Sequence, residues 1–139
     1  MIILDTNLVS ELMREDPDIT VLAWVEAQMM EDLWTTTVTV FELRYGILKM
    51  PPGRRRTGLM TAVERVVSEA LAGRIFPLDI EAAEAAAHLM VTREQRGHVV
   101  SVEDTLIAGI AVARRASIAT RNRRDFADAG IAILDPWGG

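Results

Sequence analysis

Four acidic residues stand where a predicted strand ends or a predicted helix begins: Asp5, Glu42, Asp104 and Asp125. Asp5 directly follows the apolar run Met1–Leu4, and Asp125 lies just past the apolar segment Ser117–Thr120. In parallel α/β folds, functional groups gather beyond the carboxyl ends of the strands. Two carboxylates about 4 Å apart would repel by about 4 kcal/mol at an effective dielectric of about 20. Acids that converge there need protons or a cation, and an oxygen-only set favours Mg2+ or Mn2+.

A hard divalent ion held by such carboxylates supplies the chemistry of phosphodiester hydrolysis. It lowers the pKa of a bound water and stabilises the charge that develops on the phosphate. Glu42 and Asp104 are each followed one helical turn later by a small residue, Gly46 and Ala108. Because positions four apart share a helix face, a small residue there leaves room beside the carboxylate for a metal, water or substrate.

Helix capping is the alternative explanation for each of these acids. The segments Thr39–Glu42, Ser101–Asp104 and Asn122–Asp125 all have the spacing of a capping box. Asp5 could itself be an N-cap, and helix N-termini stabilise carboxylates through the helix dipole. The spacing alone therefore leaves both a catalytic and a capping role open.

The composition restricts the class of protein. The length of 139 residues, half of them hydrophobic, suits a single domain over residues 1–139. The chain has no cysteine, which excludes a disulfide scaffold and a thiolate zinc site. Its start, Met1–Asn7, lacks the features of a signal peptide, and no apolar stretch is long enough to cross a membrane. We therefore expect a cytoplasmic protein with no membrane partner.

The charge pattern bears on nucleic-acid binding. A net charge of −5 argues against binding through a broadly basic surface. Metal ions held by acidic residues would reverse the local field and remove that objection. Arginines form two clusters, which are typical of solvated faces but could also contact RNA phosphates: Arg54, Arg55 and Arg56, and Arg121, Arg123 and Arg124. His88 and His98 are isolated, and we expect them to lie on a helix surface or in the core.

Short apolar runs alternate with helical patterns along the chain. The hydrophobic spacing predicts helices that include Thr6–Met13, Ile19–Met30 and Thr57–Ala72. The predicted strands are Met1–Leu4, Leu33–Thr37, Ile75–Leu78, Ser117–Thr120 and Ile131–Leu134. Apolar strands separated by helices indicate a parallel sheet that is covered on both faces.

Five stretches of the sequence resemble the PIN-domain ribonucleases, the toxin half of VapBC-type toxin–antitoxin pairs. These stretches are Ile3–Asn7, Thr39–Gly46, Asp104–Ala108, Ala119–Asn122 and Asp125–Phe126. The match covers nearly the whole chain, and the full set in this order is specific. Near the end of the chain, Asp135–Trp137 looks closest to the FitB branch of the family, as does Ala72–Asp79 before it.

The resemblance implies an α/β/α sandwich with a mainly parallel central sheet, and RNA hydrolysis by a water activated by Mg2+ or Mn2+. Asp5, Glu42 and Asp104 match the acids of the family. Its members carry a fourth acid at the position of either Asn122 or Asp125, and here Asp125 is the favoured carboxylate. The resemblance implies hydrogen-bonding support from Thr6, Asn7, Thr39, Thr120 and Asn122. It also implies a homodimer and a small DNA-binding antitoxin that covers the acidic pocket.

Three other functions compete with a nuclease. A receiver domain needs a lysine near the end of the sheet, but the only lysine, Lys49, falls in a predicted helix. A haloacid-dehalogenase phosphatase needs a second aspartate two residues after Asp5, where this chain has Asn7. The strongest rival is a catalytically silent PIN-fold protein that acts as a binding partner in a DNA-bound complex with an antitoxin.

Overall fold

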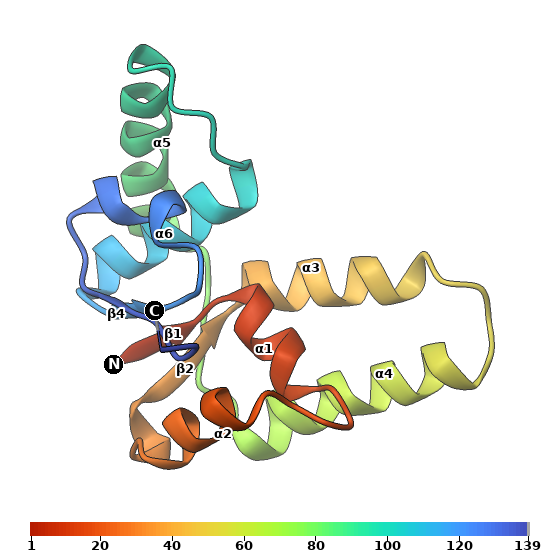
Figure 1. Ribbon diagram of the computed structural model, residues 1–139. Helices are drawn as coiled ribbons and strands as arrows, with labels where there is room; N and C mark the ends of the chain where they lie inside the picture. The colour runs from red at the N-terminus through yellow and green to blue at the C-terminus, as the bar shows by residue number, and fades with distance from the viewer. Residues whose placement is uncertain (139) are drawn as a thin grey trace.

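The computed structural model describes residues 1–138 and contains one sheet of five strands (Figure 1). The strands are β1 Ile2–Leu4, β2 Leu33–Thr36, β3 Ile75–Phe76, β4 Ser117–Ala119 and β5 Ile133–Leu134. They lie in the order β3-β2-β1-β4-β5, and every neighbouring pair is parallel. β1 is therefore the central strand, and the predicted parallel sheet is confirmed.

Helices cover both faces of the sheet. Successive residues of β1 point to opposite faces, so Ile3 packs in one core with α5 and α6, and Leu4 packs in the other with α1 and α2. α3 and α4 form an antiparallel pair that extends away from the sheet (Figure 1). The helices are α1 Thr6–Leu12, α2 Ile19–Glu26, α3 Thr37–Leu48, α4 Arg54–Arg65, α5 Ile80–Gln95 and α6 Val102–Arg114. The predicted α/β/α sandwich is confirmed.

Several element boundaries differ from the sequence-based expectation. The helix expected from Thr57 begins at Arg54, because the arginines after the Pro-Pro-Gly loop are good helix formers. It changes at Val66 into the π-helical turn η2, Val66–Ala70. The strand expected to reach Leu78 ends at Phe76, because the next residue is a proline, which cannot donate to a sheet ladder.

The remaining short elements are helical turns. They are η1 Met30–Asp32, η3 Arg123–Asp125 and η4 Ala127–Ala129. The helix expected over Ile19–Met30 ends at Glu26, and the strand expected from Ile131 begins at Ile133. Across residues 1–138, every helix is too short or too polar to pass through a bilayer.

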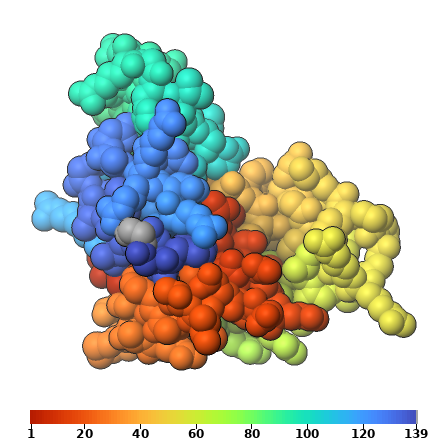
Figure 2. All heavy atoms as spheres, in the orientation of Figure 1, coloured from red at the N-terminus to blue at the C-terminus, as the bar shows by residue number. Residues whose placement is uncertain are grey.

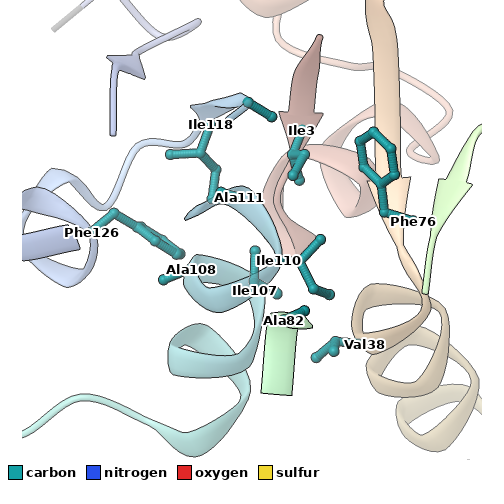
Figure 3. Close-up of a cluster of buried hydrophobic side chains, with 11 residues drawn as sticks. Ile3, Val38, Phe76, Ala82, Ile107, Ala108, Ile110, Ala111, Ile118 and Phe126 are labelled. Atoms are coloured by element: carbon teal, nitrogen blue, oxygen red, sulfur yellow. The ribbon is translucent and has the colours of Figure 1, made fainter. Parts of the chain in front are cut away.

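A glycine sets the close approach of α5 and α6. A Cβ atom added at Gly109 would lie 2.6 Å from the carbonyl oxygen of Ala82 and 2.7 Å from the Cβ of Ala86. The small residues therefore let the two helices touch at this point. Ile107, on the same helix, is fully buried in the core between α6 and the sheet (Figure 3). This packing fixes α6, whose first turn carries Asp104.

Candidate active site

Asp5 lies at the carboxyl end of β1, the central strand. The sheet continues from β1 through β2 on one side and through β4 on the other. Such a switch point is the usual place for a site in a parallel sheet. The Asp5 side chain is buried, and its Oδ1 accepts a hydrogen bond of 2.9 Å from the Leu8 N–H. Its Oδ2 accepts one of 2.6 Å from the hydroxyl of Thr120, which follows the neighbouring strand β4. Asp5 is therefore the N-cap of α1 and also a buried carboxylate at the switch point.

The electrostatic surroundings of Asp5 include two other acids. Burial raises the pKa of the Asp5 carboxyl above its usual value. The hydrogen bonds from Thr120 and Leu8 oppose this shift, whereas the charges of Glu42 and Asp125 add to it. Acids from α3 and from the segment after β4 therefore act on the acid at the end of β1.

Glu42 lies in the second turn of α3, and its position is fixed by a threonine of α1. The Thr6 hydroxyl donates to Glu42 Oε1 over 2.7 Å, and the hydroxyls of Thr6 and Thr39 lie 3.0 Å apart. Burial chiefly raises the pKa of Glu42, and the charge of Glu103 adds to this, while Thr6 opposes it. The cap of α3 is Thr36, which accepts from the Thr39 N–H, so the capping-box alternative is wrong for Glu42.

The negative charges of all three other acids act on Asp104. Ser101 is the N-cap of α6, and its hydroxyl oxygen accepts a hydrogen bond of 3.1 Å from the Asp104 N–H. Burial is the main cause that raises the pKa of Asp104 to about 6. The negative charges of Asp125, Glu42 and Asp5 raise it further, as does a hydrogen bond between the Asp104 and Asp125 side chains. The structure thus brings the four acids toward one another at the carboxyl end of the sheet.

The other polar residues expected near the acids take different positions. Thr120 links Asp5 to the following loop, because its hydroxyl donates to Asp5 and accepts from the Asn122 N–H over 2.9 Å. Asn122 precedes η3 without capping it through its side chain, so the capping-box alternative also fails there. Asn7 is exposed at the start of α1.

A groove of about 510 Å³ opens beside Glu42. It lies between α3 and the start of α6, where the space-filling view shows a recess between the α3–α4 arm and the α5–α6 region (Figure 2). A side chain at Gly46 would enter open space, as expected for a small residue beside Glu42. Ala108, in contrast, is buried in the core and leaves no room beside Asp104. The residues that line the groove are Phe41, Glu42, Tyr45, Gly46, Lys49 and Glu103.

The donor chemistry of the four acids suits a hard divalent cation. Within residues 1–138, no three Asp, Glu or His side chains lie close enough together to enclose a metal ion as they stand. The acids nevertheless raise one another's pKa, so a cation between them would relieve their repulsion. Within the described residues, the ion pairs involve acids outside this set of four. These acids are Glu11, Glu64, Asp79 and Asp128.

Only one of the two arginine clusters lies beside the acids. Arg121, Arg123 and Arg124 are exposed in the segment that carries Asp125, and the Arg121 guanidinium lies 4.6 Å from the centre of the Trp137 ring. The other cluster, Arg54–Arg56, forms the first turn of α4 at the outer end of the arm (Figure 1). The structure therefore does not bring the two clusters together.

The sequence reasoning missed Arg93, whose side chain is only 1% exposed. It forms an ion pair with Asp128 in η4 and lowers the pKa of that carboxyl through hydrogen bonding. Arg93 follows Ala86 by seven residues, on the face of α5 that packs against α6. The sequence did contain a signal for this residue, because an arginine occupies a position on the apolar face of a predicted helix. Such a charge is buried only when it is paired, so a partner acid could have been sought.

Comparison with known proteins identifies the family. A PIN domain matches residues 2–132. The VapC ribonuclease Y4jK of Sinorhizobium fredii is 45% identical over 99% of this chain and 98% of its own length. Toxin FitB of Neisseria gonorrhoeae is 33% identical, with 99% of both proteins covered.

The crystal structure of FitAcB from Neisseria gonorrhoeae superposes with a TM-score of 0.89 at 32% identity, covering 100% of both chains. The structure of FitAB bound to an IR36 DNA fragment gives 0.88 at 32% identity, covering 100% of this chain and 97% of the other. The chain therefore belongs to the PIN-domain family, among the VapC- and FitB-type proteins, as its motifs predicted.

Proposed function

We propose that this protein is a metal-dependent endoribonuclease, the toxin of a type II toxin–antitoxin system, that acts in the cytoplasm as one domain over residues 1–139. The observation that carries the proposal is the electrostatic interaction of Asp104 with the other three acids. Burial and these neighbouring charges raise the pKa of Asp104 to about 6. Perturbed titratable groups at the switch point of a parallel sheet are characteristic of catalytic sites. The name of the relative Y4jK, a VapC ribonuclease, agrees with this chemistry.

The proposed mechanism divides the work among the acids. Asp5 and Asp104 are the main metal ligands, and Asp125 completes the set with Asn122 as a polar neighbour. A bound Mg2+ or Mn2+ would supply positive charge near the scissile phosphate and would lower the pKa of a water. Glu42, which accepts a hydrogen bond of 2.7 Å from the Thr6 hydroxyl, would bind the metal through a water or act as a base.

The surroundings of the acids fit an RNA substrate. Arg121, Arg123 and Arg124 are exposed in the same segment as Asp125, where they can hold the phosphates that flank the cleaved bond. Arg54, Arg55 and Arg56, at the end of the arm, can contact only RNA that extends beyond the site. A hard cation held by the acids would make the local field favourable for RNA despite the chain's net charge of −5.

The proposed partners are a small DNA-binding antitoxin and a second copy of the chain. FitAB, a structural relative, was solved bound to a DNA fragment. A cationic side chain of an antitoxin would suit the cluster of acids, because it would relieve their mutual repulsion. Exposed apolar side chains of α3, namely Phe41, Tyr45 and Leu48, support self-association. Light scattering after size exclusion measures the oligomeric state, and a small DNA-binding protein encoded beside this gene would support the antitoxin.

RNA cleavage in Mg2+ or Mn2+ tests the proposed activity. Asp5→Asn should lower the rate at least about a hundredfold, because it removes a charge that holds the metal while an asparagine can still cap α1. Glu84→Gln, an exposed acid of α5, is the matched control and should cleave like the wild type. Equal cleavage by Asp5→Asn and the wild type would reject the nuclease and favour the catalytically silent partner in a DNA-bound complex.

A further inference from the structure

The buried guanidinium of Arg93 joins three segments that meet beside the acids. Its Nε and Nη2 donate to the two carboxylate oxygens of Asp128 over 2.9 Å and 2.8 Å. Its Nη1 donates to the Thr105 hydroxyl over 2.8 Å, and its Nη2 also donates to the backbone carbonyl of Asp125 over 2.5 Å. One side chain from the last turn of α5 therefore reaches α6, η3 and η4.

Each of these contacts lies next to an acid of the site. Thr105 immediately follows Asp104 in the first turn of α6 and donates its hydroxyl to the Ser101 carbonyl over 2.9 Å. The carbonyl that Arg93 holds belongs to Asp125 itself. Arg93 thus fixes the backbone of one acid and the neighbour of the other.

The shape of the guanidinium explains why an arginine is needed here. Its planar fork donates in fixed directions, so the bidentate pair with Asp128 sets both the distance and the orientation of η4 relative to α5. A lysine is a single point charge and cannot hold all three acceptors in this geometry. A charge this deeply buried is tolerated only because its donors are satisfied.

We propose that Arg93 is a positioning residue of the acidic site, which anchors the backbone segments that carry Asp104 and Asp125 and so keeps these two acids side by side. The metal-binding part of this inference rests on the proposed function. Residues that orient the ligands of a metal, without touching the ion, typically change metal affinity by about 10- to 100-fold when they are substituted.

The test replaces the pair together, as Arg93→Met with Asp128→Leu, so that no unpaired charge stays buried. Calorimetry with Mn2+, without RNA, should show at least about tenfold weaker binding than in the wild type. Hydrogen exchange of the Asp125 and Phe126 amides, which donate within the η3 turn, should become at least about tenfold faster. Val63→Ala is the control, because it destabilises the buried side of α4 and should change neither measurement.

A folded double variant with wild-type Mn2+ affinity and wild-type exchange would overturn the proposal. If the wild type itself bound no Mn2+, the proposed function would fail, and the exchange of the two amides would still decide the role of Arg93. If the double variant did not fold, Thr105→Val would take its place, since it keeps the side-chain shape and removes one acceptor. That variant should bind Mn2+ about threefold more weakly, and unchanged binding would again overturn the proposal.

Discussion

Removing the charge of Asp104 should make the metal-free protein more stable at neutral pH, even though it removes a proposed metal ligand. The pKa of Asp104 in the folded protein is raised from 3.8 to about 6, chiefly by burial and then by the other acids. A raised pKa means that the folded state favours the protonated carboxyl. The stability that this group contributes is therefore fully present below about pH 4 and is lost as the pH rises through about 6.

The expected gain for Asp104→Asn follows from that shift. The shift from 3.8 to about 6 corresponds to about 3 kcal/mol at most. Asp104 is only half-buried, so solvent screening reduces this figure. The carboxylate also gains about 0.3–1 kcal/mol from the N-terminus of α6, which an asparagine loses. We expect Asp104→Asn to raise the free energy of unfolding by about 1–2 kcal/mol at about pH 7.5.

Urea unfolding in EDTA at about pH 7.5 and about pH 4 measures this difference. The advantage of the variant should nearly disappear at the lower pH, because the wild-type Asp104 is then largely protonated. Glu84→Gln removes an exposed charge of α5 and should differ from the wild type by less than about 0.5 kcal/mol at both pH values. A variant that is no more stable than the wild type at about pH 7.5 would refute the claim that burial and the neighbouring acids raise the pKa of Asp104.

Three further predictions concern packing and metal binding. Gly109→Ala should lower the free energy of unfolding by about 1–3 kcal/mol, because the added methyl group would collide with α5. Gly58→Ala, whose methyl group enters open space, should raise it by about 0.4–1 kcal/mol. Urea unfolding measures both, and equal effects would contradict the close contact between α5 and α6. Phe126→Ala, fully buried in the core, should cost about 3–5 kcal/mol in the same assay, and Val99→Ala, which is exposed, less than about 0.5 kcal/mol. Mn2+ at about a hundred times its Kd should stabilise the wild type by about 2.7 kcal/mol but leave Asp104→Asn unchanged, as thermal unfolding would show.

The sequence predicted the strands of the sheet, and the place of Asp5 at the end of one, because both depend on local patterns. The apolar run Met1–Leu4 predicts a buried strand, and in the structure β1 pairs with β4, so that the ends of the two strands lie side by side. The sequence did not specify that these two strands would be neighbours, but the structure joins Asp5 to Thr120 by a hydrogen bond of 2.6 Å. The sequence did not decide whether Asp5 caps a helix or belongs to the acid cluster, and the structure shows that it does both.

What the sequence could not predict depends on packing between distant segments. Arg93 finds its partner Asp128 35 residues later, and no local pattern specifies that pair. The turn at Val66–Ala70 is another example, since its sequence reads as a continuous α-helix while the structure winds it more loosely. Ala108 was expected beside an open space, but it lies on the side of α6 that packs into the core.

The hydrogen bond between Asp5 and Thr120 spans 115 residues, and Asp125 comes later still. A ribosome has therefore translated most of this chain before the last acid reaches the first. Under the proposed function, a nascent chain cannot damage the RNA of the cell that is making it, and a product cut short before β4 is harmless. The proposed activity would therefore begin only when translation of the chain is nearly finished.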